Sequence, residues 1–148
     1  MLYLEDFEPG SVHAAGSVRL SEEEILEFGC RYDPQPFHVD PEAARASVYG
    51  GLIASGWQTV AVTMRLLVDN VFNEAASMGS PGVDEIRWTR PVRPGDTLAA
   101  RVTVLETRVS KSRPDRGVLR FKIEVDNQDG EPTMSMVGAS FVGCRPAS

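Results

Sequence analysis

Apolar and charged residues alternate most regularly in the second half of the chain. Between positions 119 and 125 the odd positions are apolar and the even positions are charged (Leu119-Arg120-Phe121-Lys122-Ile123-Glu124-Val125). A period of two is typical of a strand that buries one face against a core. Positions 98–104 alternate in the same way. We therefore predict two long strands that share one apolar face.

Turn signals delimit further strands on either side of this pair. Arg93-Pro94-Gly95-Asp96 has proline and glycine at the positions that a type II turn favours. Asp129-Gly130 is a hairpin turn signal, and we expect the last strand after it to carry Val137, Ala139 and Phe141 on one face. Weaker alternation predicts two more strands, over residues 11–20 and 83–92.

Two short helices are predicted from their N-terminal caps. Ser21 and Glu24 form a capping box, and the helix that follows stops at the proline-rich stretch 31–41. Asp40 is the expected N-cap of a second helix that has Pro41 at its first position and runs through Ala46. Asp40 is therefore structural on this interpretation.

A third helix is predicted over the longest apolar stretch, residues 60–72. Its apolar positions cover most of the circumference, which indicates a helix buried nearly all round. We expect Met64 to belong to the core, and Arg65 to pair with Asp69 one turn later.

These elements predict an α+β fold in which an antiparallel sheet wraps around one long central helix. A sheet with one apolar face and an apolar helix bury their surfaces best against each other. The chain has 148 residues, enough for one domain with its own core, and contains no repeat, linker or low-complexity segment. We expect a single domain over residues 1–148.

The stretch 31–41 carries the strongest candidate chemistry. Its three prolines push Asp33, Gln35 and Asp40 out of the helical region, so the loop is stiff. A carboxylate held near an imidazole is a common general acid–base arrangement, which singles out Asp33 and His38. The alternative is that Asp33 caps a turn and that His38 is a structural side chain. The residues alone leave both open.

Composition narrows the possible partners. The net charge of −6 argues against nucleic acid as a partner, because phosphate binding depends on Lys and Arg. Cys30 and Cys144 form no CxxC pair and the chain has two histidines, so we expect reduced thiols and no metal. Residues 1–10 do not resemble a signal peptide and no apolar run has the length of a membrane span. We expect a cytoplasmic protein that does not enter a membrane.

Three motifs together resemble the MaoC-like, (R)-specific enoyl-CoA hydratases of the hotdog fold. Asp33-Pro34-Gln35-Pro36-Phe37-His38-Val39-Asp40 is similar to the family's Asp-x-Asn-Pro-Leu-His-x-Asp, with Gln for Asn. Ile53-Ala54-Ser55-Gly56-Trp57 is similar to Ile-x-His-Gly-Met, with Ser for His. Residues 90–98 resemble the family's PV-x-x-GD-x-L turn. Where members often carry a serine two turns after the glycine, this chain has Thr63 and Met64.

The resemblance implies reversible syn addition of water to a trans-2-enoyl-CoA, giving an (R)-3-hydroxyacyl-CoA in fatty acid metabolism. Asp33 and His38 would act on one shared water. The backbone N–H of Gly56, at the helix start, would meet the charge on the thioester oxygen. The resemblance also implies a homodimer or dimer of dimers, and no cofactor beyond the coenzyme A of the substrate. The residues expected to contact the substrate are Gln35, Phe37, Ser55 and Trp57.

Two other functions fit the same fold, because a fold does not decide chemistry. One is an acyl-CoA thioesterase, and the other is an acyl-binding protein without catalysis. Hydration consumes the enoyl group whereas hydrolysis releases a thiol, so a crotonyl-CoA assay separates all three. Acyl length, pathway and the choice between coenzyme A and a carrier protein stay open. Lys111, Arg113 and Arg116 lie between two predicted strands, and either bind phosphates or form a solvated basic hairpin tip.

Overall fold

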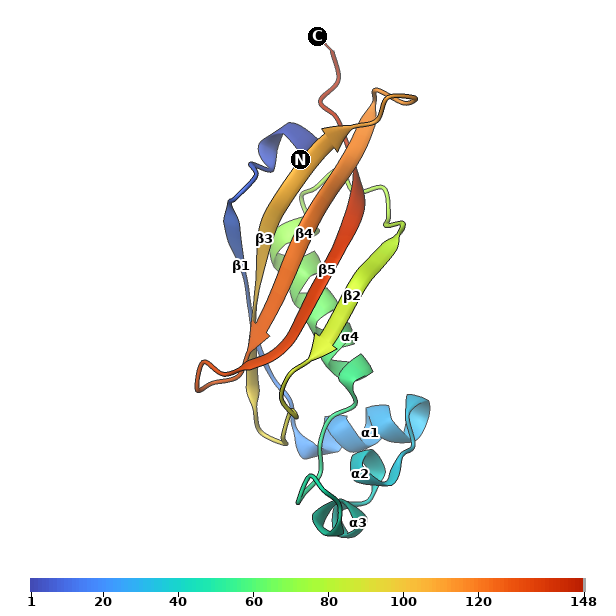
Figure 1. Cartoon of the computed structure of the whole chain (residues 1–148), viewed down its shortest axis with the longest axis vertical. Coiled ribbons are helices and arrows are strands. Elements are labelled where there is room, and N and C mark those ends of the chain that lie inside the picture. Colours follow the sequence, from blue (N-terminus) through green and yellow to red (C-terminus); the bar gives the residue numbers. More distant parts are fainter. Residues whose placement is uncertain (148) are drawn as a thin grey trace.

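The predicted strands form one antiparallel sheet. The computed structural model describes residues 1–147. Figure 1 shows the strands curved across one side of the central helix, in the order β1-β3-β4-β5-β2. All four pairings are antiparallel. The strand order makes β1 and β2 the edge strands. The strands are β1 Val12–Arg19, β2 Gly82–Trp88, β3 Thr97–Val109, β4 Arg116–Asp126 and β5 Pro132–Gly143.

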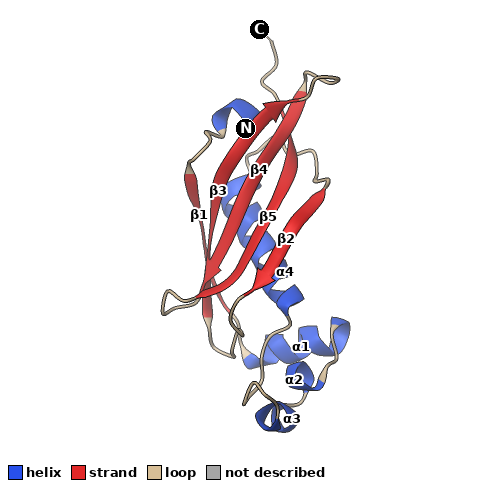
Figure 2. Ribbon diagram, in the orientation of Figure 1, coloured by secondary structure: helices blue, strands red, loops and turns tan. Residues whose placement is uncertain are grey.

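The helices occupy two places, as Figure 2 shows. The longest, α4, lies along the inner face of the sheet and continues as a π-helical segment. The three others gather at one end of the molecule, next to the start of α4. A 3₁₀ turn, Leu4–Asp6, precedes β1. The helices are α1 Glu22–Tyr32, α2 Pro36–Val39, α3 Pro41–Ala46 and α4 Gly56–Leu67, with the π-helical segment Val68–Phe72 after it.

This architecture confirms the α+β prediction of an antiparallel sheet around one central helix. The turns between strands also follow the sequence, since Gly95 and Gly130 adopt the positive φ values of 87° and 74°. Among residues 1–147, no helix combines the length and the apolarity that crossing a bilayer requires.

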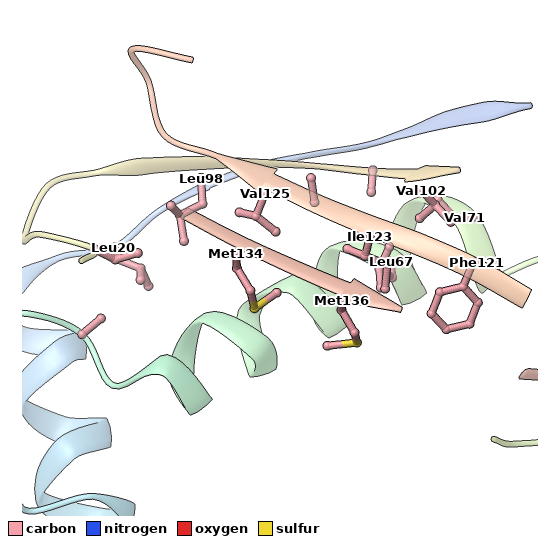
Figure 3. Packing of buried hydrophobic residues seen from close by; sticks show 14 of the residues in the cluster. Leu20, Leu67, Val71, Leu98, Val102, Phe121, Ile123, Val125, Met134 and Met136 are labelled. Carbon is pink, nitrogen blue, oxygen red and sulfur yellow. The ribbon is translucent and has the colours of Figure 1, made fainter. Parts of the chain in front are cut away.

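The core lies between the sheet and α4. The predicted alternation on β3 and β4 is confirmed: Leu98, Val102, Ile123 and Val125 are each at most 1% exposed. Figure 3 shows these side chains directed from the strands toward α4, where Leu67 meets them. Burial of this apolar face is the main favourable contribution to folding.

The last strand carries Val137, Ala139 and Phe141 on one face, as predicted, and its register places that face on the outer side of the sheet. Met136 of β5 pairs with Ile123, so β5 places its even-numbered residues on the core side. Val137 and Phe141 therefore lie on the outer face, where Phe141 pairs with Val118. Both faces of β5 carry apolar residues, so the period of two could not select one of them.

The prediction that α4 is buried nearly all round was wrong for the single chain. Met64, expected in the core, is 49% exposed, and Val68 is 45% exposed. The sheet covers one side of α4, on which Thr59, Thr63 and Leu67 are buried. The predicted pair between Arg65 and Asp69 is present, with 2.7 Å between Nε and Oδ2.

Both predicted helix caps are confirmed. The Ser21 hydroxyl accepts a hydrogen bond from Glu24 N at 3.1 Å, and the Glu24 carboxylate accepts one from Ser21 N. Asp40 Oδ1 accepts hydrogen bonds from the backbone N–H groups of Glu42 and Ala43. The short helix α2 was not expected. Its first residue is Pro36, and proline is favoured at the first position of a helix, as at Pro41 in α3.

Replacing Asp40 tests the structural role of this cap. Asp40→Ala leaves two N–H groups of α3 without their acceptor, and should lower the free energy of unfolding by about 1 kcal/mol. Asp40→Asn keeps an accepting oxygen and should stay close to the parent protein. Urea denaturation of the three proteins measures the difference. Equal stability of the alanine and asparagine variants would contradict the capping role.

Candidate active site

Three helix ends converge on Asp33. Asp33 follows the last residue of α1 as its C-cap, and its N–H donates to Gly29 O at 2.9 Å. His38 lies in α2, and Ser55 is the N-cap of α4. The prolines on either side of Gln35 keep the connection between α1 and α2 extended. The local sequence therefore brings Asp33 and His38 to the start of the central helix.

Asp33 and His38 face each other, as predicted. His38 Nε2 lies 3.3 Å from Asp33 Oδ2, and the two side chains are 6% and 18% exposed, respectively. His38 Nδ1 lies 2.8 Å from the carbonyl oxygen of Ile53. A carbonyl can only accept, so Nδ1 carries the hydrogen. In the neutral ring Nε2 is then a free base directed at Asp33.

Two further side chains bind the Asp33 carboxylate. The Ser55 hydroxyl donates to Oδ2 at 2.7 Å, and Gln35 Nε2 donates to Oδ1 at 2.8 Å. Burial raises the pKa of Asp33, but the hydrogen bonds from Ser55 and Gln35 and the nearby charge of His38 outweigh it. The net effect lowers the pKa, so Asp33 stays ionised at neutral pH.

Gly56 is the first residue of α4 and lines the cavity beside the pair. Within residues 1–147 its N–H donates to no acceptor, as expected for an amide at a helix start. The space above its Cα is filled by the indole of Trp88, because a Cβ at this position would lie 2.4 Å from Trp88 Cε2. Trp88 Nε1 also donates to Gly56 O at 3.0 Å. The missing side chain thus makes room for Trp88, which sequence reasoning did not anticipate.

The pair opens into a cavity of about 480 Å³, within the usual size of a small-molecule site. Of the residues predicted to contact substrate, Gln35, Phe37 and Trp57 line it. Ser55 does not: its side chain is fully buried and bonded to Asp33. The remaining lining residues are Asp33, His38, Tyr49, Ile53, Ala54, Gly56, Thr59, Trp88, Thr89, Arg90, Pro91 and Val92.

Aromatic contacts form two walls of this cavity that the motifs did not predict. The ring centroids of Phe37 and Tyr49 are 5.2 Å apart, and those of Trp57 and Trp88 are 5.3 Å apart, both edge to face. Each pair joins residues from different parts of the chain, so no local pattern signals it. Arg90 lines the cavity from the β2–β3 loop and pairs with Glu131.

The hydroxyl that the family often places on the central helix does not reach the cavity. Thr63 is 1% exposed, its hydroxyl has no hydrogen-bond partner within residues 1–147, and it does not line the cavity. Met64 lies on the exposed face of α4. Within residues 1–147, no group of three or more His, Cys, Asp or Glu side chains is arranged to hold a metal ion.

Comparisons with a domain family, with other protein sequences and with solved structures each found matches to this chain. The sequence profile described as "MaoC like domain" matches residues 7–125. The uncharacterized protein YdeM of Bacillus subtilis (strain 168) is 31% identical over 84% of this chain and 87% of its own length. The crystal structure of a MaoC-like dehydratase from Rhodospirillum rubrum is 42% identical and covers 99% of this chain and 100% of that one, with a TM-score of 0.92.

A more distant structure shares the fold. The (R)-hydratase PhaJ1 of Pseudomonas aeruginosa superposes with a TM-score of 0.74 at 22% identity, over 97% of this chain and 86% of that one.

The Ser55 hydrogen bond can be tested through the titration of Asp33. Ser55→Ala removes a donor to the carboxylate and should raise the pKa of Asp33. The stabilisation from ionised Asp33 is present above the unfolded-state pKa and is lost as pH falls through the folded pKa. In Ser55→Ala this loss should begin at a higher pH.

The ¹³C chemical shift of the Asp33 carboxyl, followed by NMR against pH, measures this change. Ser55→Ala also removes the hydrogen bond that the Ser55 hydroxyl accepts from Trp57 N, at 3.3 Å. Asp40→Ala provides a matched loss of a helix cap elsewhere, and should leave the titration of Asp33 unchanged. An unchanged pKa in Ser55→Ala would show that the serine acts only as a cap.

Proposed function

The chain belongs to the MaoC-like domain family and has the hotdog fold, and on that premise we propose that it catalyses reversible hydration of a trans-2-enoyl-CoA to an (R)-3-hydroxyacyl-CoA. The family includes (R)-hydratases, which supports a dehydratase at the level of the family. The observation that carries the proposal for this chain is the Asp33–His38 pair, at 3.3 Å, beside the unpaired N–H of Gly56 in one cavity.

The orientation of His38 supports a division of roles within the pair. Its Nδ1–H is bound by Ile53 O, so Nε2 can take a proton from a water in the cavity that contacts both the ring and Asp33. Asp33 has a lowered pKa and holds a proton weakly, so it orients the water and stabilises the imidazolium. The water oxygen then attacks C3 of the enoyl group.

The same proton completes the reaction. As C3 is attacked, negative charge moves to the thioester oxygen, where the N–H of Gly56 and the positive end of the α4 dipole stabilise it. His38 returns its proton to C2, and the thioester carbonyl re-forms. One hydroxyl and one hydrogen are added on the same face, and the pair ends in its starting protonation state. These steps need no cofactor beyond the coenzyme A that the substrate carries.

The cavity walls suit the acyl part of such a substrate. Phe37, Tyr49 and Trp57 are aromatic, and the charged residues of the lining are Asp33, His38 and Arg90. Apolar walls with few convergent polar groups are typical of a site that orients an apolar ligand.

We also propose that two copies associate through β2 and the exposed face of α4. Trp57, Met64 and Val68 of α4 are 58%, 49% and 45% exposed, and Trp88 of β2 is 45% exposed. The contact between Trp57 and Trp88 joins these residues into one apolar surface at an open sheet edge. Such an edge and patch are typical of a self-association surface. The resulting homodimer would cover the cavity wall that Trp57 and Trp88 form.

The proposed hydration is tested with crotonyl-CoA, by following enoyl absorbance and free thiol separately. Loss of absorbance without thiol release is expected. Asp33→Asn and His38→Gln should each lower kcat/KM by roughly 10²–10⁴. The double variant should be little worse than the poorer single variant, because both groups act on one water.

Circular dichroism should first show that these variants are folded. If the double variant loses the product of the two single-variant losses in kcat/KM, the two groups do not act on one shared water. Thiol release in place of hydration would favour a thioesterase. The absence of both signals would favour an acyl-binding protein.

The proposed dimer is tested by sedimentation at micromolar concentration. The parent protein should sediment at twice the mass of the chain. Met64→Glu places a charge in the apolar surface and should shift the protein toward the monomer. Val48→Glu is the matched control, since Val48 is 96% exposed and lies outside this surface. A parent protein that sediments as a monomer would contradict the interface.

A further inference from the structure

Trp88 lies against the residue that begins the central helix. It is the last residue of β2 and lines the cavity together with Gly56. Its indole Nε1 donates to Gly56 O at 3.0 Å. If position 56 had a side chain, its Cβ would lie 2.4 Å from Cε2, 2.6 Å from Nε1 and 2.8 Å from Cδ2 of this ring. The indole therefore packs directly on the backbone of Gly56 and leaves no room for a side chain there.

The glycine is required by this contact and not by its own backbone conformation. Gly56 has no positive φ, unlike Gly95 and Gly130, so its backbone adopts a conformation that other residues also adopt. Alanine has a higher helix propensity than glycine, so the helix itself does not favour glycine at this position. What excludes a side chain is the indole of Trp88. The two residues are therefore complementary in shape, although they are 32 positions apart in the chain.

The two peptide groups on either side of the Gly56 Cα are held by different partners. Ser55 O, in the peptide group that carries the Gly56 N–H, accepts from Gln58 N at 2.9 Å and from Thr59 N at 3.2 Å. Gly56 O, in the next peptide group, accepts from the indole of Trp88. Glycine has more backbone freedom than any other residue, so fixing only one of these groups leaves the other free to rotate. Trp88 removes that freedom at Gly56.

Trp88 is itself held by the sheet and by a second indole. Its backbone belongs to β2, where it pairs with Met134 of β5. Figure 1 shows the end of β2 beside the first turn of α4. The ring of Trp57 contacts the ring of Trp88 edge to face, with 5.3 Å between the centroids and an interplanar angle of 75°. Trp88 thus connects the rigid sheet to the start of the helix.

We propose that Trp88 is a positioning residue, which holds the Gly56 N–H in the direction where it meets the thioester oxygen of the substrate. The proposal rests on the hydration proposed above, in which this N–H stabilises negative charge. Such a donor is effective because it is oriented before the reaction begins, and a small misplacement lowers the rate. Within residues 1–147, Trp88 forms no hydrogen bond with Asp33 or His38. Trp88 therefore acts on the oxygen of the thioester and not on proton transfer.

The contact between the two residues is tested by urea denaturation, without any enzyme assay. Gly56→Ala in the parent protein should lower the denaturation midpoint, because the new Cβ meets the indole. In a Trp88→Ala protein the same substitution should no longer lower the midpoint, since the indole is gone and alanine suits a helix. An equal loss in both backgrounds would show that Trp88 is not what excludes a side chain at position 56, and would overturn the contact.

Kinetics then test the effect on the reaction. Trp88→Phe keeps an aromatic ring and removes the indole N–H. It should lower kcat for crotonyl-CoA by about tenfold, less than the roughly 10²–10³ expected for loss of an oxyanion donor, with a smaller change in KM. The pH dependence of kcat/KM reports the acid–base pair and should be that of the parent. An unchanged kcat, or a shifted pH profile, would overturn the role.

Ile86→Val is the matched control for this variant. Ile86 lies two positions before Trp88 and so on the same side of β2, where it packs against the core and does not line the cavity. The control removes volume from the same strand without touching Gly56, and should leave kcat unchanged. A loss of kcat in Ile86→Val equal to that in Trp88→Phe would show that any loosening of β2 lowers the rate, and would overturn the specific role of Trp88.

The carbonyl stretch of a bound thioester reports the hydrogen bond from Gly56 directly. Butyryl-CoA has no double bond to hydrate, and its thioester carbonyl is labelled with ¹³C for infrared spectroscopy. A hydrogen bond lowers the stretching frequency, so the frequency should be lower in the parent than in Trp88→Phe. Equal frequencies would overturn the proposal. If the parent does not hydrate crotonyl-CoA, the proposed function fails, whereas the carbonyl frequency still decides whether Trp88 positions the N–H.

A last measurement uses the parent protein alone and does not depend on how a variant folds. The chain has two tryptophans, so its ¹⁵N-labelled indole N–H groups give two NMR signals. Within residues 1–147 the indole N–H of Trp57 has no acceptor, whereas that of Trp88 is bound by Gly56 O. The Trp88 N–H should exchange with solvent more slowly than that of Trp57, and should stay slow when butyryl-CoA is bound. Equally fast exchange in the bound state would show that Trp88 has released Gly56, and would overturn the proposal.

Discussion

The candidate site depends on the hydrogen bonds that converge on the Asp33 carboxylate. Ser55 and Gln35 donate to its two oxygens, while His38 faces the oxygen that Ser55 binds. These contacts join the end of α1, the start of α2 and the N-cap of α4. These donors offset the cost of partly removing the ionised carboxylate from water. The same bonds position Asp33 and lower its pKa, so structure and chemistry share one network.

The central helix has two functions that make different demands on its faces. One face packs Thr59, Thr63 and Leu67 against the sheet. Its first turn presents the Gly56 N–H to the cavity, while Met64 and Val68 lie exposed on the other side. A helix that is apolar on both sides needs a second layer to cover it. The proposed dimer would provide that layer and complete the cavity wall at Trp57 and Trp88.

The sequence by itself determined the features that depend on neighbours a few residues away. Strand alternation, the caps at Ser21 and Asp40, and the stiff loop that carries Asp33 and His38 all follow from such local rules. Only the tertiary structure decided that Ser55 bonds to Asp33, 22 positions earlier, and that Trp88 fills the space above Gly56. It also decided the faces of β5 and α4, because an apolar residue fits a core or an open surface equally well. Pairing register and the extent of the sheet make that choice, and neither is encoded in local periodicity.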